Sequence, residues 1–262
     1  MNLNLSNKTA IVCGGSQGLG LASAIELSLL GANVILVSRN KEKLEAALTQ
    51  LDTSKGQQHG FLTADFSEPA QVKEMIEAFL QKGKSIHILI NNTGGPAGGN
   101  ILDAETASFE KAFQMHIVCN QVLVQATSPG MKKEGYGRII NIISTSVKQP
   151  IDGLGVSNTI RGAVASWSKT LANELGAFGI TVNNVLPGFT ETERLDYVLG
   201  QKALKTGTEL KEEKEKAAAS IPARRLGLPH EFGAVVAFLC SPAASYVNGI
   251  NLPVDGGKLS CL

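Results

Sequence analysis

The stretch that decides the fold is Cys13-Gly14-Gly15-Ser16-Gln17-Gly18-Leu19-Gly20, which joins a short apolar run to a helical pattern. Its glycines allow a tight turn, a close backbone approach to a phosphate, and close contact between helix and strand. The following helix offers free N–H groups and the positive end of its dipole to a pyrophosphate. Because the loop follows a predicted strand and opens a predicted helix, it indicates a dinucleotide site rather than a merely structural turn. The residues expected to contact the dinucleotide here are Gly14, Ser16, Gln17, Gly18, Leu19 and Gly20.

Outward from this loop, short apolar runs alternate with amphipathic stretches along the chain. Strands are predicted at residues 9–13, 33–38, 60–63, 86–91, 137–143, 181–186 and 250–254. Helices are predicted at residues 19–30, 41–51, 69–81, 109–131, 154–177 and 230–239. The runs at 34–37 and 86–90 are apolar at successive positions, which indicates strands covered on both faces. The alternation predicts an α/β fold over residues 1–262, a single-domain, Rossmann-like doubly wound parallel sheet flanked by helices.

Composition excludes several classes of protein. Of 262 residues, 24 are Lys or Arg and 23 are Asp or Glu, giving a net charge of +1 that offers no basic field to nucleic acid or an anionic membrane. The polar start and the lack of a long apolar run argue against a secretory leader and a membrane span. Four scattered cysteines without a CxxC pair predict reduced thiols in a cytoplasmic protein. No metal is predicted, because no cluster of His, Cys and carboxylates has ligand spacing.

One segment interrupts the alternation of strands and helices. Residues 191–219 are charged and helix-prone, and they follow the strand predicted at 181–186. Ligands of doubly wound proteins bind outside the carboxyl ends of the strands, so this segment is expected to form a mobile lid there. A solvated helical insertion is the alternative. We refer to residues 191–219 as the lid segment.

The end of the second predicted strand bears on which dinucleotide binds. An acidic side chain there would bond a ribose 2′-hydroxyl, whereas a basic one suits a 2′-phosphate. The chain has Ser38-Arg39-Asn40-Lys41 at this place, with no acid at the strand end. A guanidinium can hold phosphate through parallel charge-assisted hydrogen bonds. Ser38 and Arg39 therefore favour NADP(H) over NAD(H).

Taken together, the motifs resemble the short-chain dehydrogenase/reductase family, and the 3-oxoacyl-carrier-protein-reductase type in particular. The likeness extends over nearly the whole chain. It includes Asn91-Asn92-Thr93-Gly94, the stretch 138–144 ending in Ser144, the segment Pro187-Gly188-Phe189-Thr190-Glu191-Thr192, and Val254-Asp255-Gly256-Gly257. The resemblance implies cofactor contacts at Asp65, Phe66, Asn92, Gly94, Pro187, Gly188 and Thr192, and a homo-oligomer, a tetramer or a dimer.

The catalytic positions depart from the family pattern. The family's Tyr-x-x-x-Lys pair lies about 13 residues past its active-site serine, where this chain has Ser157 and Arg161. The helix before that serine usually carries an Asn of a proton relay, and His116 falls at this place. Asn120 is the candidate if the register shifts by one turn. Three of the family's four catalytic residues are therefore replaced.

The replacements predict altered proton delivery. A serine hydroxyl is a far weaker acid than a phenol beside a lysine, and Arg161 does not give up its proton. Histidine titrates near neutrality, so His116 is the expected substitute, directly or through Ser144 or Ser157. Tyr197 in the lid segment is a second candidate donor.

The leading hypothesis is an NADP(H)-dependent oxidoreductase acting on a carbonyl or alcohol. In it Arg161 is the electrostatic and ribose anchor, Ser144 the substrate hydrogen-bond donor, and Ser157 and His116 the relay. A catalytically silent NADP(H)-binding sensor or scaffold is the first alternative. The second alternative is an isomerase or a dehydratase that uses the same pocket.

Overall fold

Seven parallel strands form one sheet in the order β3-β2-β1-β4-β5-β6-β7. The computed structural model describes residues 1–261. The strands are β1 (Thr9–Cys13), β2 (Asn33–Ser38), β3 (Gly60–Thr63), β4 (Ile88–Asn91), β5 (Gly137–Ile142), β6 (Ile180–Pro187) and β7 (Asn251–Val254). The chain builds outward from β1 to β3 and then returns to place β4 on the other side of β1. This reversal makes the carboxyl ends of β1 and β4 the place where a doubly wound sheet binds its ligand.

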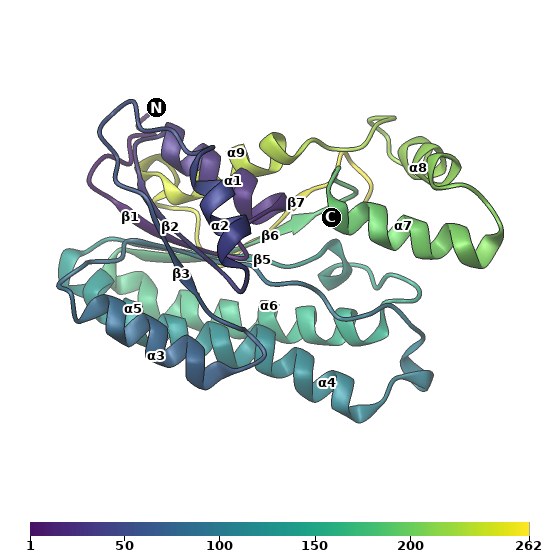
Figure 1. The fold of residues 1–262 in the computed structure, drawn as a ribbon, viewed down its shortest axis with the longest axis horizontal. Coiled ribbons are helices and arrows are strands. Elements are labelled where there is room, and N and C mark those ends of the chain that lie inside the picture. Colours follow the sequence, from purple (N-terminus) through teal and green to yellow (C-terminus); the bar gives the residue numbers. More distant parts are fainter. Residues whose placement is uncertain (262) are drawn as a thin grey trace.

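Helices cover both faces of the sheet (Figure 1), which confirms the predicted fold class. The helices are α1 (Gly18–Leu29), α2 (Lys41–Leu48), α3 (Pro69–Leu80), α4 (Thr106–Phe113), α5 (Cys119–Glu134), α6 (Gly155–Leu175), α7 (Glu193–Thr206), α8 (Leu210–Ala219) and α9 (Pro229–Cys240). In Figure 1, α1, α2 and α9 lie on one side of the strands, and α3 to α6 lie on the other.

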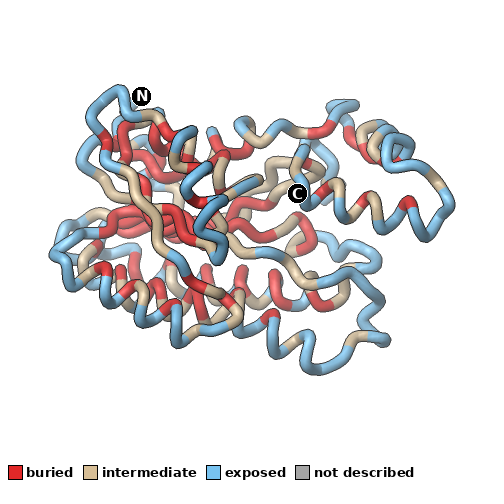
Figure 2. The backbone as a smooth tube through the Cα atoms, viewed as in Figure 1, coloured by how far each residue is buried: buried red, intermediate tan, exposed pale blue. Residues whose placement is uncertain are grey.

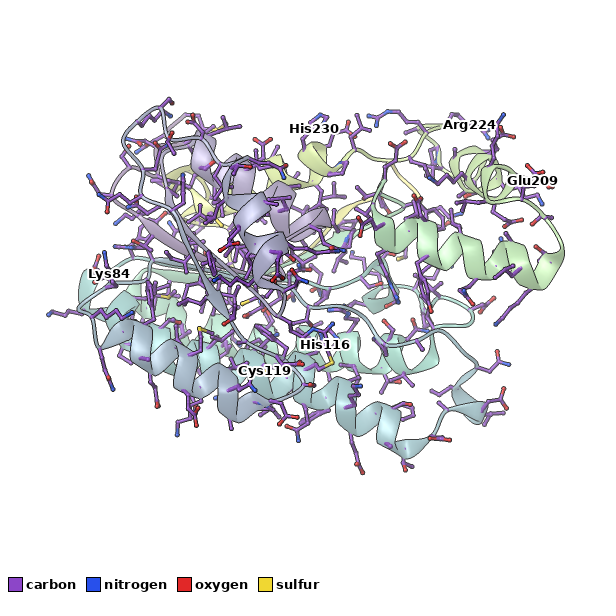
Figure 3. The ribbon with its side chains drawn as sticks, viewed as in Figure 1. Lys84, His116, Cys119, Glu209, Arg224 and His230 are labelled. Atoms are coloured by element: carbon purple, nitrogen blue, oxygen red, sulfur yellow. The ribbon has the colours of Figure 1, made fainter. Side chains whose placement is uncertain are left out.

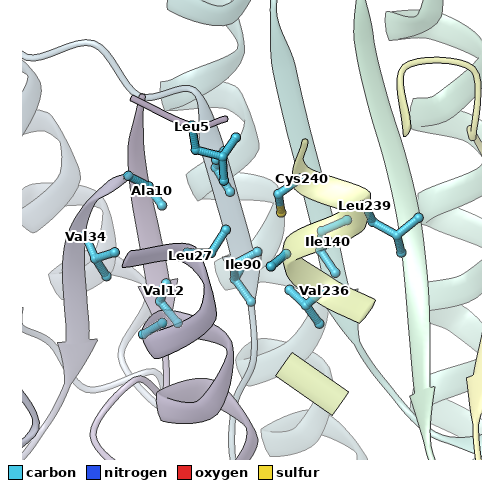
Figure 4. Close-up of a cluster of buried hydrophobic side chains, with 14 of the residues drawn as sticks. Leu5, Ala10, Val12, Leu27, Val34, Ile90, Ile140, Val236, Leu239 and Cys240 are labelled. Atoms are coloured by element: carbon cyan, nitrogen blue, oxygen red, sulfur yellow. The ribbon is translucent and has the colours of Figure 1, made fainter. Parts of the chain in front are cut away.

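The two helical layers explain why the strands are continuously apolar. Along β1, Ala10 and Val12 pack into the cluster beneath α1 and α9, which Figure 4 shows in close-up. Ile11 and Cys13 point the opposite way into the cluster beneath α3 and α5. Successive residues of a strand face opposite sides, so a sheet with two cores needs apolar residues at every position.

The helix predicted at 109–131 is interrupted in the structure. α4 and α5 are joined by a π-helical segment, Gln114–Val118, that contains His116. A π-turn inserts one extra residue into the helical repeat and so changes the direction in which side chains project. The prediction of one regular helix was wrong at this point.

Four asparagines in register cross the carboxyl half of the sheet. Asn91 donates to Asn141 at 2.8 Å, Asn141 to Asn184 at 2.9 Å, and Asn184 to Asn251 at 2.8 Å. Each pair also matches in strand register across β4, β5, β6 and β7. The hydrogen bonds satisfy most polar atoms of amides that would otherwise be costly to bury, but the buried Asn91 Oδ1 has no partner within residues 1–261. We call these four residues the asparagine ladder.

The lid segment forms α7 and α8, which project beyond the end of the sheet (Figure 1). Its side chains Leu195, Leu199 and Ala217 pack with Ile221 and Leu226, which follow it in the chain, in a small apolar cluster separate from the two clusters on the sheet. Most of its remaining surface is exposed or half-buried (Figure 2). Within residues 1–261, no helix combines the length and apolarity needed to cross a membrane.

Candidate functional site

The glycine loop is shaped to let another group approach its backbone. Gly14 and Gly18 both have φ of +58°, a conformation that disfavours other residues. A Cβ on Gly14 would lie 2.6 Å from Asn92 Nδ2, and a Cβ on Gly20 would meet the Gly14 carbonyl oxygen. Gln17 is the N-cap of α1 but makes no capping hydrogen bond with its side chain. The first-turn N–H groups of α1 are thus left for an anion, and the loop fits a dinucleotide pyrophosphate.

Two further loops meet the glycine loop at this edge of the sheet. Asn92, just after β4, donates from Nδ2 to the carbonyl oxygens of Cys13 and Gly14, both at 3.3 Å. From the lid segment, Glu193 accepts a hydrogen bond of 2.9 Å from the Gln17 amide. Thr192 lies beside Gly18 and caps α7 through the backbone N–H of Leu195. The structure thus brings the predicted cofactor residues of β1, β4 and the lid segment together.

Pro187 and Gly188 end β6 beside β7. The Gly188 N–H donates to the Val254 carbonyl at 3.0 Å. A Cβ on Gly188 would lie 2.6 Å from the Asp255 Cα, so only glycine fits there. These contacts hold Pro187 and Gly188 in place just before the lid segment begins at residue 191.

The end of β2 opens onto a cavity of about 790 Å³. The predicted residues on its wall are Gly14, Ser38, Arg39, Asp65, Phe66, Asn92, Gly94 and His116. The Arg39 side chain is 75% exposed and lies 3.7 Å from the Asp65 carboxylate, so it is free to turn toward a phosphate. Hydrogen bonds from Ser67, more than the charge of Arg39, lower the pKa of Asp65 and keep it ionised. Lys43, which the sequence did not single out, donates from Nζ to the side-chain Oε1 of Gln17 at 2.7 Å and adds a second cation nearby.

His116, on the wall of this cavity, and Arg161, which is in contact with it but is not itself a lining residue, form the centre of the predicted catalytic group. His116 is 2% exposed, and its Nδ1 lies 2.7 Å from the Thr93 hydroxyl and 3.4 Å from Arg161 Nη1. Arg161 is 8% exposed and donates from the same Nη1 to the Ile142 carbonyl at 3.2 Å. That bond places the guanidinium over the carboxyl end of β5.

The protonation of this pair follows from its burial. Burial first, and the charge of Arg161 second, hold the pKa of His116 well below its usual range, against a weaker opposing effect of the Gly94 backbone. The imidazole is therefore neutral at physiological pH. Burial and the charge of Arg194 lower the pKa of Arg161 to about 10, so the guanidinium stays charged. His116 Nε2 is buried with no hydrogen-bond partner among residues 1–261.

The two predicted serines are placed near Arg161 by the backbone. Ser144 lies two residues beyond Ile142, whose carbonyl accepts from Arg161; it is half-buried and accepts a hydrogen bond from the Ser146 N–H at 3.1 Å. Ser157 is half-buried on the first turn of α6, one helical turn before Arg161. Residues at i and i+4 share one face of a helix, so Ser157 and Arg161 project on the same side.

The alternative candidates are placed less favourably. Asn120 is buried in the first turn of α5, about one helical turn beyond His116, and makes no hydrogen bond with Arg161 in the described part of the chain. Tyr197 is 55% exposed on α7, with the Arg194 guanidinium 5.5 Å from its ring centroid. Figure 3 labels His116 and Cys119 on one side of the sheet and His230 on the other. Among residues 1–261, no three His, Cys, Asp or Glu side chains come together as a metal site would require.

Thr93 and Arg194 contribute to the site although sequence reasoning gave them no role. Thr93 stands within the recognised Asn-Asn-Thr-Gly turn, so its position was a usable signal for contact with His116. Arg194 belongs to a charged helix, where a single arginine carries no signal of its own. Its Nη2 donates to the Pro96 carbonyl at 2.9 Å, on the loop after β4.

The doubly wound sheet and its glycine loop define a dinucleotide-binding protein, and comparison with known proteins identifies the family. A family profile described as enoyl-(acyl carrier protein) reductase matches residues 14–258. Dehydrogenase/reductase SDR family member 4 of Oryctolagus cuniculus is 31% identical over 98% of this chain and 96% of its own length. A 3-oxoacyl-[acyl-carrier-protein] reductase of Vibrio cholerae is 31% identical over 97% and 98%, respectively. The chain belongs to the short-chain dehydrogenase/reductase family of oxidoreductases, which confirms the resemblance seen in its motifs.

Solved structures agree with this assignment. L-sorbose reductase from Gluconobacter frateurii, in complex with NADPH and L-sorbose, superimposes with a TM-score of 0.93 at 29% identity and covers 100% of both chains. YwfH, an NADPH-dependent reductase involved in bacilysin biosynthesis, has a TM-score of 0.92 at 28% identity, over 98% of this chain and 100% of its own.

Proposed function

We propose that this protein is an NADP(H)-dependent oxidoreductase that reduces a carbonyl, or oxidises the corresponding alcohol, with Ser157 and Arg161 in place of the family's Tyr and Lys. The observation that carries this proposal is the buried guanidinium of Arg161, held over the carboxyl end of β5 beside a neutral His116. A fixed cation in a buried site stabilises negative charge that develops on a substrate oxygen.

The choice of NADP(H) rests on the cations at the adenosine end of the cavity. Arg39 is exposed and mobile enough to meet a 2′-phosphate, and Lys43 lies next to Gln17 of the glycine loop. The similar L-sorbose reductase was solved with NADPH. Asp65 remains available for the adenine through its ionised carboxylate.

The bound cofactor supplies the hydride. Arg161 stabilises the alkoxide that forms on the carbonyl oxygen, and Ser144 donates a hydrogen bond to the same oxygen. Ser157 stands on the helix face of Arg161, at the place of the missing phenol. Because His116 is neutral, it is not itself the proton donor in the resting enzyme. It serves as a relay that accepts a proton at one ring nitrogen and releases one from the other, and Thr93 is its hydrogen-bond partner at Nδ1.

The lid segment is proposed to close over this end of the cavity. Two recorded hydrogen bonds support a closed arrangement, one from Gln17 to Glu193 and one from Arg194 to Pro96. Both partners lie on loops that carry predicted cofactor or substrate contacts. A homo-oligomer remains a prediction from the family resemblance.

The proposal is tested by NADPH oxidation with a panel of neutral and acidic carbonyl compounds. Arg161→Ala is expected to lower kcat by about 100-fold or more, because one preorganised electrostatic group is lost. Arg161→Lys, which restores the family residue, should retain more activity than Arg161→Ala. Calorimetry with NADPH on both variants checks that the site still binds cofactor.

The outcomes separate an enzyme from a silent relative. Turnover that depends on Arg161 supports the proposal. The loss of kcat in Ser157→Ala then measures how much Ser157 contributes to catalysis. Tight NADPH binding with no turnover of any carbonyl would instead favour the sensor or scaffold, for which the absence of the phenol and the lysine is the supporting observation. Product formation without a change in nicotinamide absorbance would favour an isomerase or dehydratase.

A further inference from the structure

Two guanidinium groups from distant parts of the chain converge on the loop after β4. A Cβ built on Gly95 would lie 3.8 Å from Arg161 Nη2 and 3.5 Å from Arg194 Nη2. The two nitrogens are therefore at most about 7 Å apart. Arg161 comes from α6, a helix that packs on the sheet, and Arg194 comes from the first turn of α7, so the body of the fold and the lid segment each contribute one cation.

Neither guanidinium is paired with an anionic side chain in the part of the chain that the structure describes. Among residues 1–261, no carboxylate lies within ion-pair distance of Arg161 or Arg194. Arg161 contacts the Ile142 carbonyl and His116, and Arg194 contacts the Pro96 carbonyl and the face of Tyr197. These partners offer only partial negative charge. Within residues 1–261 the Nη2 of Arg161 makes no hydrogen bond, and the Nη2 of Arg194 uses one of its two N–H groups on the Pro96 carbonyl and keeps the other.

This arrangement is unfavourable without a ligand. A buried cation is costly unless it is paired, and a second cation nearby adds repulsion. The cost is visible in the pKa of Arg161, which burial and Arg194 together lower to about 10. A bound anion would remove both penalties, so the pair is suited to hold one.

The cofactor does not account for this anion site. Its pyrophosphate is expected at the N-terminus of α1, and its 2′-phosphate at Arg39. Within the lid segment, Glu193 is the residue that bonds Gln17 of the glycine loop, whereas the next residue, Arg194, reaches the β4 loop instead. The anion that Arg194 and Arg161 face therefore belongs to the substrate.

We propose that the substrate carries a carboxylate, bound between Arg161 and Arg194, a few bonds from its reacting carbonyl. This inference rests on the proposed function. Two separate Nη2 groups match the two oxygens of a carboxylate. In the forward reaction the carbonyl carbon gains the hydride, the π electron pair moves to the oxygen, and that oxygen takes a proton, which leaves a hydroxy acid and NADP⁺.

The test compares acids with their neutral methyl esters. The probes are 2-oxobutyrate, 2-oxoglutarate, acetoacetate and levulinate, each beside its ester, and binding is measured by calorimetry with NADP⁺ present, so that no turnover is needed. At least one acid is expected to bind tenfold or more tightly than its ester. Arg194→Gln should remove that preference, and Arg194→Lys should keep part of it.

Lys205→Gln provides the matched control. Lys205 is an exposed cation on the same α7 helix, so its loss changes the net charge equally without touching the Gly95 loop. Acid affinity is expected to be unchanged in this variant. An equal loss in both variants would overturn the proposal, because it would show general electrostatic attraction rather than a site.

Other outcomes also decide the question. If esters bind as tightly as acids, or if inorganic phosphate binds more tightly than every acid, the carboxylate site is overturned. If Arg194→Gln weakens NADPH and leaves acid binding unchanged, Arg194 serves the cofactor and the inference is again wrong. Turnover of neutral carbonyls alone would overturn this inference while the proposed function stands, whereas failure to bind NADPH would overturn the proposed function itself.

Discussion

At the scale of single residues, the site divides charge and proton transfer between two side chains. Arg161 holds a permanent positive charge, and its proximity helps to keep His116 neutral. In the family's Tyr-x-x-x-Lys pattern, a single lysine supplies the cation beside the tyrosine phenol. Here a neutral imidazole stands beside the cation instead, and its buried Nε2 has no hydrogen-bond partner among the residues that the structure describes. Proton delivery is therefore expected to depend on a relay rather than on an acidic group.

The neutral state of His116 has a measurable consequence for stability. In the unfolded chain His116 takes up a proton below about pH 6.5, whereas in the folded chain it does so only at much lower pH. The unfolded state then binds more protons, so the free energy of unfolding falls as pH drops below about 6.5. The expected contribution is about 1.4 kcal/mol per pH unit, until the lower folded pKa is reached.

Chemical denaturation between pH 7.5 and 5 tests this expectation. His116→Asn, which restores the residue type of the family relay, should reduce the slope of the unfolding free energy against pH by the share of one proton, about 1.4 kcal/mol per pH unit. Equal slopes in wild type and His116→Asn below pH 6.5 would show that His116 titrates normally in the folded chain.

At the scale of the elements, the asparagine ladder ties together the four strands that end beneath the site. Asn141 is fully buried at its centre, donating to Asn184 and Ser168 and accepting from Asn91. The ladder fixes the register of β4 and β5 just before Asn92 and Ser144. A change in the ladder is thus expected to disturb both stability and the geometry of the loops that follow.

Asn141→Ala should lower the free energy of unfolding by roughly 2–5 kcal/mol, because it leaves buried polar groups on both neighbours without partners. Asn251→Ala is the matched control at the end of the ladder, where the residue is half-buried and a loss of about 1 kcal/mol is expected. Urea denaturation of both variants measures the difference. Similar losses in the two variants would mean that the ladder is not a connected network.

How far the sequence predicts these elements depends on the kind of signal. β1 and β2 match their predicted bounds because continuous apolar runs between polar turns mark buried parallel strands. β3 also matches its predicted bounds, although it is an edge strand without a fully buried residue. The π-helical turn at His116 was missed because apolar periodicity does not distinguish one inserted residue from a regular helix. The pairing of Arg161 with Arg194 depends on how the lid segment packs, which no local pattern in the sequence contains.

At the scale of the whole molecule, the sheet and the lid segment meet at the candidate site, and they differ in the size of their apolar clusters. The sheet carries a large apolar cluster on each face, whereas α7 and α8 share one small cluster. The recorded side-chain hydrogen bonds between α7 and the sheet's loops are those of Glu193 with Gln17 and Arg194 with Pro96. Segments with few buried contacts open at lower free energy than the core. The lid segment is therefore expected to open without unfolding of the sheet.

Hydrogen exchange of the full-length protein tests this expectation. Without ligand, amides of α7 and α8 should exchange much faster than those of α5, which is packed against the sheet. Saturating NADPH should slow exchange in the first turns of α7, because a dinucleotide at the glycine loop would hold Gln17 and with it Glu193. Glu193→Ala should weaken that protection at α7 and leave the protection at α1 in place, since the glycine loop itself is unchanged. Exchange in α7 as slow as in α5 without ligand, or protection by NADPH that does not reach α7, would contradict a lid that closes on the cofactor.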